Sequence, residues 1–310
     1  MGVAPDVSVI IVNWNLKDDL RSCLSSIQPR GSPLEVETIV VDNGSGDGSL
    51  EMIRDDFPDV TLISNHENLG FAHASNQGME AAAGRYLFLL NNDALLKGDC
   101  LALLVKFMDD HPDVGICGPR VVSADGTLQV RSKGFYPSIS TALEQFYVPG
   151  FLKKRSRRVG FYEPRDLTDF QEIEWLSGCA LMGRGEALEA VGLLDEETFT
   201  CFGNSYCDDV DWCYRMNKAG WKVMYVPEAE VLHHGGKTMK ELRGKVVCAH
   251  AIGLTNFFSK HHGRFSSVVF NTMVGLGYSI QAAGWVGGAI FGQRTGYDKL
   301  KRLLPGRKSA

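Results

Sequence analysis

The sequence predicts an α/β protein with a mostly parallel central sheet, helices on both faces and a C-terminal helical extension. Two observations support this prediction. Apolar runs alternate with amphipathic segments through about the first hundred residues, which is the pattern of repeated βαβ units. Each apolar run also ends in a polar turn, and the carboxyl ends of parallel strands are where such sheets bind ligands.

Four strands and three helices are expected in the first part of the chain. The strands are short apolar runs at residues 7–12, 36–41, 60–63 and 86–90. The helices have apolar residues at helical spacing, at residues 16–27, 50–57 and 71–83.

The pattern is looser after a helix at 101–108. An Asp125-Gly126 turn predicts a hairpin over 121–130. Ordered structure is expected again in five further segments. They are an apolar segment at 172–182, helices at 185–191 and about 208–219, and short strands at 222–226 and 229–232. From Met239 onward the chain is expected to be helical.

Composition excludes several classes of protein. The chain has 310 residues, of which 44% are hydrophobic and 22% charged, so it can bury a large core. Its net charge of −5 provides no general attraction for nucleic acid. The residues before the first strand lack the basic region of a secretory signal, which favours a cytoplasmic location, either free or at the inner face of the membrane.

The eight cysteines are scattered and form no C-x-x-C pair, so we expect reduced thiols and no zinc site. They are Cys23, Cys100, Cys117, Cys179, Cys201, Cys207, Cys213 and Cys248.

An uncharged stretch runs from Phe265 to Gln293. It permits three readings: a helix packed on the catalytic domain or on a second subunit, a helix lying in a membrane interface, or a membrane span. Small residues recur every four positions, a spacing that permits close helix packing; they are Gly275, Ser279, Ala283 and Gly287. Basic residues at 153–158 and after residue 293 would suit an anionic membrane surface.

The run Asp42-Asn43-Gly44-Ser45 follows the second strand directly. Small residues let the backbone turn sharply near a ligand, and Asp42 could accept hydrogen bonds from a base or ribose. A glycine-rich turn that only caps the next helix is the alternative. The run is neither a G-x-G-x-x-G fingerprint nor a P-loop.

Asn91-Asn92-Asp93 follows the fourth strand, so the Asp93 carboxylate emerges at the edge of the sheet. Mg²⁺ and Mn²⁺ need few protein oxygens when a substrate phosphate completes their shell, so one carboxylate with one distant partner would suffice. The alternative is an Asx turn without a ligand.

Three aspartates, Asp208, Asp209 and Asp211, open the helix at 208–219. Helix capping and an Asp211–Arg215 pair explain one or two of them. The third suggests a catalytic base held rigidly at the start of a buried helix. His233 follows the last strand and could ligate a metal through a neutral imidazole, although a solvated or satisfied histidine is the commoner outcome.

Seven segments together give the chain a family resemblance. In order they are VSVIIVNWN, IVVDNGSGDGS, NLGFAHASNQG, YLFLLNNDALL, WLSGCALMGR, CDDVDWCYRMNKAGW and PEAEVLHHGGKT. The set resembles the inverting family 2 glycosyltransferases, and within them the bacterial rhamnosyltransferase-like branch. It covers about residues 7–238.

The resemblance implies a GT-A fold, a nucleotide-diphosphate sugar donor and a divalent metal, Mg²⁺ or Mn²⁺. It implies a nucleotide-sugar-binding half at 1–98 and an acceptor and catalytic half at 99–238. The resemblance assigns no function to the C-terminal helical extension at 239–310, for which the uncharged stretch leaves association with a membrane or a second copy, or packing on the domain, as the expectations. The residues it assigns to the donor are Asn13, Asn15, Asp42, Ser45, Asn68, Gly70, Phe71, Asn76, Asn91 and Asn92.

The resemblance also assigns the chemistry. Asp93 and His233 would hold the metal, although His234 is an alternative to His233, and Asp209 would be the base, with Asp208 and Asp211 as supporting acids. The acceptor, a glycan or lipid-linked saccharide, would contact Trp175, Gly178 and Cys179, for which a core strand is the equal alternative. The first guess for the donor is dTDP-rhamnose.

Three positions depart from the family pattern. Asn91 replaces the first aspartate of the D-x-D motif, Asp208 replaces a more usual glutamate, and Lys237-Thr238 follows the histidine pair where small residues are common. Two other functions stay open at this point, a sugar-phosphate nucleotidyltransferase and a non-catalytic sugar-binding or scaffold protein.

Overall fold

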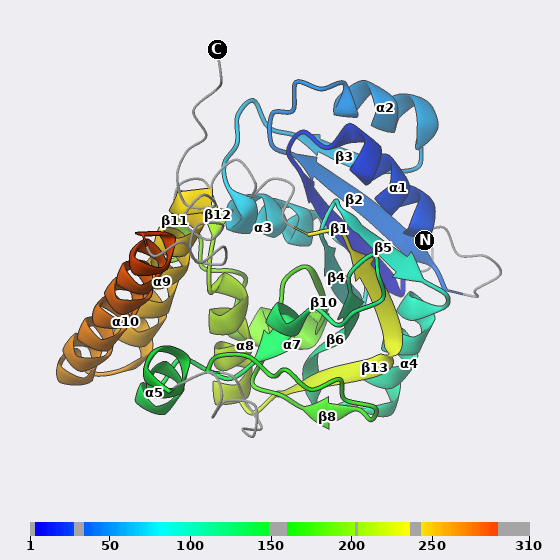
Figure 1. Cartoon of the computed structure of the whole chain (residues 1–310). Helices are drawn as coiled ribbons and strands as arrows, with labels where there is room; N and C mark the ends of the chain where they lie inside the picture. Colours follow the sequence, from blue (N-terminus) through cyan, green and yellow to red (C-terminus); the bar gives the residue numbers. More distant parts are fainter. Residues whose placement is uncertain (1–3, 28–33, 149–159, 202–203, 236–242, 291–310) are drawn as a thin grey trace, which may run out of the picture.

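A nine-stranded sheet is the centre of the fold (Figure 1). The computed structural model describes residues 4–27, 34–148, 160–201, 204–235 and 243–290. In the first half the strands are β1 (Val7–Asn13), β2 (Val36–Asp42), β3 (Thr61–Ser64), β4 (Tyr86–Leu90) and β5 (Ala94–Lys97). In the second half they are β6 (Val114–Val122), β8 (Gln171–Glu172), β10 (Ala180–Arg184) and β13 (Lys222–His233).

The strand order is β3-β2-β1-β4-β10-β6-β13-β5, and β8 pairs with β13. The pairs β1–β2, β2–β3, β1–β4 and β6–β13 are parallel, whereas β10 runs antiparallel to β4 and β6. The predicted mostly parallel sheet is therefore confirmed. Since Asn13 and Asp42 are register partners, the polar residues that end β1 and β2 lie side by side.

Two small strand pairs lie outside this sheet. One joins β7 (Lys133–Gly134) to β9 (Trp175–Leu176), and the other joins β11 (Thr200–Cys201) to β12 (Asn204–Ser205).

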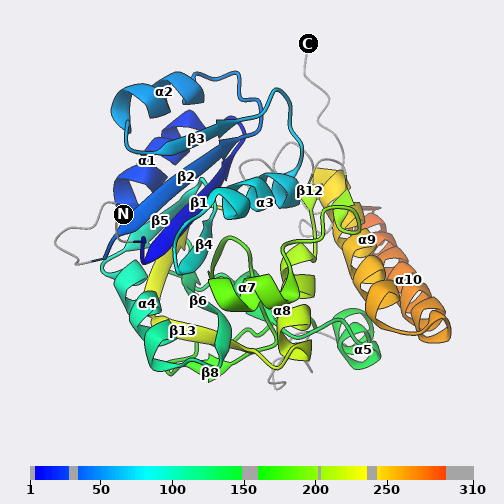
Figure 2. The same ribbon diagram turned by 180° about the vertical axis from the view of Figure 1, so that it is seen from behind.

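Helices cover both faces of the sheet (Figures 1 and 2). Residues of α1 (Lys17–Ile27), α2 (Ser49–Asp56) and α4 (Cys100–Asp110) share one apolar core. Residues of α7 (Gly185–Val191) and α8 (Asp208–Lys218) share the other, to which α3 (Phe71–Ala81) contributes Ala72 and Met79. The predicted helices in these segments are confirmed to within a few residues at their ends.

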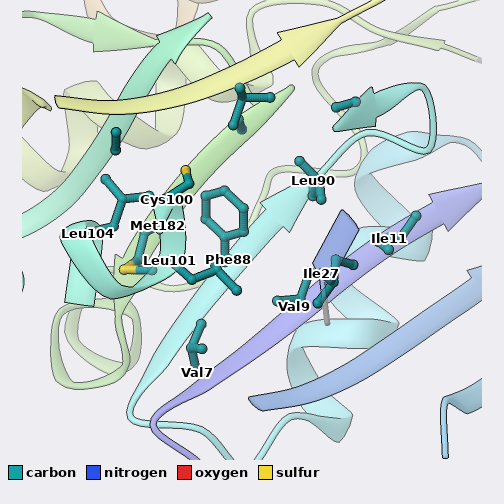
Figure 3. Packing of buried hydrophobic residues seen from close by; sticks show 14 of the residues in the cluster. Val7, Val9, Ile11, Ile27, Phe88, Leu90, Cys100, Leu101, Leu104 and Met182 are labelled. Carbon is teal, nitrogen blue, oxygen red and sulfur yellow. The ribbon is translucent and has the colours of Figure 1, made fainter. Parts of the chain in front are cut away.

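Strand alternation divides the side chains of the central strands between the two cores. Val9 and Ile11 of β1 pack with Phe88 of β4 on the side of α1 and α4, as Figure 3 shows. Ile10 and Leu89 point to the opposite core. Because both faces are covered, residues 9–12 of β1 and all of β4 are apolar at successive positions rather than at alternating ones.

Three expectations about strands need correction. The chain does fold back antiparallel at the predicted Asp125-Gly126 turn, with a bridge from Val122 to Leu128, but the first arm is the end of the longer strand β6, which begins at Val114, and the second arm is too short to be a strand. Strand β5 directly after Asp93 was not expected. The two strands at 222–226 and 229–232 are one strand, β13, with an irregular register around Pro227, which has no backbone N–H for the ladder.

The C-terminal helices α9 (Arg243–His261) and α10 (Arg264–Ile290) stand beside the sheet domain, next to α5 (Ile139–Tyr147) (Figure 2). The rings of Phe258 and Phe270 stack between α9 and α10, with their centroids 4.1 Å apart. Against α5, the close approach is at Gly277, where a Cβ would lie 2.4 Å from the Phe146 ring. Gly275, the first residue of the stripe of small residues, faces open space instead and does not make this contact.

Among the helices in the described ranges, none combines the length and the apolarity that a membrane crossing requires. The end of the uncharged stretch and the basic residues at 153–158 and beyond 293 lie outside the described residues. The seven cysteines whose side chains are described are all free thiols.

Candidate active site

The ends of β1, β2 and β4 are joined by a hydrogen-bonded polar network. Asn13 is fully buried and donates from Nδ2 to Asp42 Oδ2 at 2.8 Å and to Ser45 Oγ at 3.1 Å. Asn92 Nδ2 donates in turn to Asn13 Oδ1 at 2.8 Å. Asp42 Oδ1 also accepts from the Ser45 N–H at 2.8 Å, so this carboxylate stabilises the turn at residues 42–45.

The loop after β1 is fastened to the loop after β2. The backbone N–H of Asn15 donates to Ser45 Oγ at 2.8 Å, and Asn15 Oδ1 accepts from Gly46 N–H at 2.9 Å. Asn15 has a φ of 49°, a left-handed conformation that asparagine tolerates better than most residues. The predicted nucleotide-binding residues Asn13, Asn15, Asp42 and Ser45 therefore form one rigid unit.

The start of α3 carries the next predicted donor residues. Gly70 has a φ of 91°, and its N–H donates to Asn68 Oδ1 at 2.9 Å. Asn43 Nδ2 donates to the Gly70 carbonyl at 3.1 Å, which joins this turn to the end of β2. A Cβ placed on Gly178 would lie 3.6 Å from the Phe71 ring, so Phe71 lies beside the loop that precedes β10.

Asn76 is buried and ties α3 to the segment after α7. Its amide donates to the Leu194 carbonyl at 2.9 Å and to Glu196 Oε1 at 2.6 Å, and its oxygen accepts from Leu194 N–H at 3.0 Å. These bonds occupy both ends of the amide and give Asn76 a structural role in the fold.

Asp93 and His233 face each other across the paired strands β5 and β13. Asp93 is 6% exposed, and its Oδ1 lies 3.1 Å from His233 Nε2. Burial acts to raise the pKa of Asp93, but the hydrogen bond and charge of His233 outweigh it and leave that pKa lowered. His234 has an exposed side chain and only donates its backbone N–H to the Asp93 carbonyl at 3.0 Å.

Gln129 fixes the orientation of the His233 ring. Its Nε2 donates to the His233 carbonyl at 2.6 Å, and its Oε1 lies 2.9 Å from His233 Nδ1. An amide oxygen only accepts, so Nδ1 carries a proton, and Nε2 is the ring atom that faces Asp93 and the amide of Asn91. No sequence motif points to this role for Gln129.

This arrangement fits a divalent cation. An imidazole nitrogen and a carboxylate oxygen approach each other, and a ring fixed through its other nitrogen is the usual setting of a histidine ligand. In the described ranges, no three His, Cys, Asp or Glu side chains gather to hold a metal by themselves. A cation here would therefore need oxygen atoms of a substrate to complete its shell.

The start of α8 presents two aspartates in different surroundings. Asp208 is buried, and among the described residues its Oδ2 has no hydrogen-bond partner. Asp209 is partly exposed, and it accepts from the Gly178 N–H at 3.0 Å and from the Val210 N–H at 2.8 Å. Each Asp209 oxygen thus keeps a free lone pair in a fixed position.

Both carboxyl groups have raised pKa values. Burial is the main cause for Asp208, and the nearby charge of Asp209 adds to it. Burial also raises the pKa of Asp209, although the two backbone amides oppose that effect. A raised pKa suits a group that must accept a proton near neutral pH.

Asp211 has a different role from its two neighbours. It is fully buried and forms ion pairs with Arg215 at 2.8 Å, Lys260 at 2.9 Å and His261 at 2.6 Å. The last two residues belong to α9, so Asp211 fastens the C-terminal helices to α8 and cannot reach a substrate without breaking these pairs.

The segment Gly178-Cys179 connects the start of α8, which carries Asp209, to the end of β4, which precedes Asp93. Gly178 donates to Asp209, and the Cys179 carbonyl accepts from Asn91 N–H at 2.9 Å, two residues before Asp93. Trp175 and Cys179 are both 6% exposed, and Trp175 Nε1 donates to the Phe135 carbonyl at 3.1 Å. Their burial favours the core-strand alternative over acceptor contact for these two side chains.

Comparisons with known proteins agree with this geometry. The family model described as glycosyl transferase family 2 matches residues 8–192. An N-acetylglucosaminyl-diphospho-decaprenol L-rhamnosyltransferase of Mycobacterium tuberculosis is 26% identical over 265 residues, which are 82% of this chain and 84% of that protein. A pre-mycofactocin glycosyltransferase of the same species is 28% identical over 234 residues, covering 74% of this chain and 42% of the relative.

Solved structures show the same fold. A mannosyltransferase from Pyrobaculum calidifontis, in complex with GDP-Man and Mn²⁺, superposes with a TM-score of 0.57 at 20% identity, over 96% of this chain and 79% of the other. The structure of GalNAc-T7 with UDP, GalNAc and Mn²⁺ gives a TM-score of 0.55 at 18% identity, over 74% and 44% of the two chains. The expected GT-A fold is thereby confirmed.

Proposed function

The chain belongs to glycosyl transferase family 2, and we propose that it moves L-rhamnose from a nucleoside diphosphate donor to a hydroxyl of a lipid-linked saccharide. The enzyme class follows from the family. The donor, with dTDP-rhamnose as first candidate, and the lipid-linked acceptor are suggested by the name of the mycobacterial relative.

One observation carries the proposed chemistry. The Gly178-Cys179 segment contacts Asp209 on one side and Asn91, near Asp93 and His233, on the other. A carboxylate base and a pair of metal-type ligands therefore lie within one site. Together they suit metal-assisted transfer to a hydroxyl, whereas binding of a sugar alone would not need the base.

Asp209 acts as the general base in this proposal. It takes the proton of the acceptor hydroxyl while that oxygen forms a bond to the anomeric carbon of the donor. The bond from this carbon to the diphosphate breaks on the opposite side, so the configuration inverts and a nucleoside diphosphate leaves. The Gly178 and Val210 amides hold the carboxylate in place for this transfer.

The polar network at the ends of β1, β2 and β4 holds the nucleotide, and the Asn68–Phe71 turn lies along the donor sugar. Mg²⁺ or Mn²⁺ on Asp93 and His233 would supply positive charge beside the leaving diphosphate. Gln129 keeps the His233 lone pair directed at that position.

The outer face of α10 supports peripheral contact with the inner leaflet of the cytoplasmic membrane, where a lipid-linked acceptor would lie. Apolar side chains recur there at helical spacing and are largely exposed, at 83% for Phe265, 65% for Val268, and 56% for both Leu276 and Ile280. A homodimer through the same face is the alternative that a binding experiment distinguishes.

The direct test is a product assay. The purified chain is incubated with a panel of nucleotide sugars and a GlcNAc-diphospholipid, with and without EDTA. Transfer of rhamnose with release of dTDP, lost in EDTA and restored by Mn²⁺ or Mg²⁺, is the expected result. Release of pyrophosphate would instead identify a nucleotidyltransferase, and the absence of any product across the panel would contradict the proposal.

A further inference from the structure

Arg131 lies on a short segment that runs along the candidate site. It belongs to the 3₁₀ helix Val130–Ser132 and is exposed. On one side of it, Gln129 binds His233. On the other side, the Ser132 carbonyl accepts from Ser177 N–H at 2.9 Å, next to the residue that holds Asp209. Arg131 is therefore placed between the metal-type histidine and the loop of the base.

The guanidinium of Arg131 lies over the ring of Tyr162, with its central carbon 5.8 Å from the ring centroid. The phenol of Tyr162 lies within electrostatic range of both Arg131 and Asp209. Burial raises its pKa to about 12, while the charge of Arg131 lowers it and the charge of Asp209 raises it. Arg131 and the base thus share the surroundings of one aromatic ring.

Arg131 has no carboxylate partner in the described part of the chain, unlike several other arginines of the domain. Arg120, Arg165 and Arg215 each bind a carboxylate at 2.6–2.8 Å. An exposed guanidinium without a partner, stacked on a fixed ring beside an active site, is suited to bind an anion of the substrate.

A half-buried hydrogen-bonded chain holds the Tyr162 ring in place. The Tyr162 hydroxyl lies 3.1 Å from His250 Nε2 of α9, and His250 Nδ1 lies 2.7 Å from the Tyr278 hydroxyl of α10. Burial, followed by the charge of Arg131, lowers the pKa of His250 to about 4, so the imidazole is neutral near pH 7. The C-terminal helices therefore position the Tyr162 ring that contacts Arg131.

We propose that Arg131 binds a phosphate or diphosphate group of the acceptor and so presents the accepting sugar to Asp209. The inference rests on the proposed function and adds the chemical class of the acceptor. The donor diphosphate is assigned to the Asp93 and His233 side of the site, whereas Arg131 faces Tyr162 and the C-terminal helices. Two parallel hydrogen bonds from the guanidinium would fix an acceptor phosphate that lysine would fix less well.

The test compares two acceptors that carry the same sugar, a GlcNAc diphosphate with a short alkyl chain and the neutral alkyl glycoside of GlcNAc. In Arg131→Gln, we expect kcat/KM for the diphosphate acceptor to fall about 10-fold to 100-fold, since hydrogen bonds to charged groups have this strength. We expect less than a twofold change for the neutral acceptor and for the KM of the donor. For Arg131→Lys, kcat/KM for the diphosphate acceptor should lie between the values of the wild type and Arg131→Gln.

Arg54→Gln is the matched control, because Arg54 is an exposed arginine on α2. It should leave both acceptors unchanged. An equal fall in kcat/KM with both acceptors in Arg131→Gln would overturn the inference and assign Arg131 to the fold. A raised KM of the donor would overturn it too and assign Arg131 to donor binding.

Calorimetric binding separates this inference from the proposed transfer reaction. The diphosphate acceptor should bind the wild type more tightly than Arg131→Gln even if rhamnose proves to be the wrong donor. Equal binding by the two proteins would overturn the inference. Inorganic pyrophosphate is the second probe, and binding as tight as that of the glycosylated acceptor would show a general anion site and also overturn it.

Discussion

The backbone N–H of Gly178 donates a hydrogen bond of 3.0 Å to Oδ2 of Asp209. This bond connects the loop before β10 to the start of α8, two segments that lie 31 residues apart. It holds the carboxylate at the position where the start of α8 meets the strand ends. The orientation of the proposed base therefore depends on a backbone group.

Asp209→Asn should abolish most of the transferase activity. Asparagine keeps the shape of the side chain but cannot accept the acceptor proton, so kcat should fall about 10²-fold to 10⁴-fold. Steady-state assays with a saturating donor measure the change. Asp110→Asn, an exposed aspartate at the end of α4, is the control and should retain full activity. Turnover of Asp209→Asn within twofold of the wild type would exclude Asp209 as the base.

The pH profile of kcat/KM should report the raised pKa of Asp209. The base works only when it is ionised, so activity is lost as the pH falls through its pKa. Because burial raises that pKa, the loss should begin at a higher pH than for an ordinary aspartate. Donor binding measured over the same pH range separates this effect from the loss of metal ligands. An acid limb centred at or below the ordinary aspartate value would contradict the assignment.

Asp208→Asn should stabilise the protein at alkaline pH. The pKa of Asp208 is higher in the folded state than in the unfolded chain, so its stabilising contribution is complete at low pH and is lost as the pH rises through the folded-state pKa. Asparagine carries no charge at any of these pH values. We expect a Tm above that of the wild type by roughly 2–6 °C near pH 9, with a smaller difference near pH 5. A variant less stable than the wild type at both pH values would show that the buried charge is compensated.

Gln129→Leu should weaken metal activation. Leucine has a similar size but accepts no hydrogen bond, so the His233 ring loses the contact that fixes its lone pair. Loss of such a partner typically lowers metal affinity about 10-fold to 100-fold. Titration of activity with Mn²⁺ measures the change. His234→Ala is the control, since its side chain is exposed, and an equal effect in both variants would contradict the assignment of His233.

The outer face of α10 should bind anionic vesicles. Phe265→Asp combined with Leu276→Asp removes two exposed apolar side chains and adds negative charge, so binding to phosphatidylglycerol-containing vesicles at low salt should fall severalfold. Cosedimentation measures binding, and light scattering of the free protein tests for a dimer. Wild-type protein that dimerises and does not bind vesicles would assign this face to a second copy.

The sequence by itself determined the βαβ half of the fold and the positions of its polar strand ends. Residues 9–12, 39–41 and 86–90 are continuously apolar, and only a strand buried on both faces requires this. Asn13, Asp42 and Asn91 come at the ends of such runs, so their place at one edge of the sheet follows from the parallel connections. The helical spacing of apolar residues over 208–219 was also sufficient to predict α8.

Tertiary structure decided which of these side chains remain available to a substrate. Asp42 and Asn76 turn inward and satisfy neighbouring backbone groups, while Trp175 enters the core. Gln129 gains its role from His233, a residue 104 positions away, and Arg131 gains its surroundings from α9 and α10. Local sequence records the conformation that each segment prefers. Hydrogen-bond satisfaction and burial depend on which distant segments meet, and folding alone brings them together.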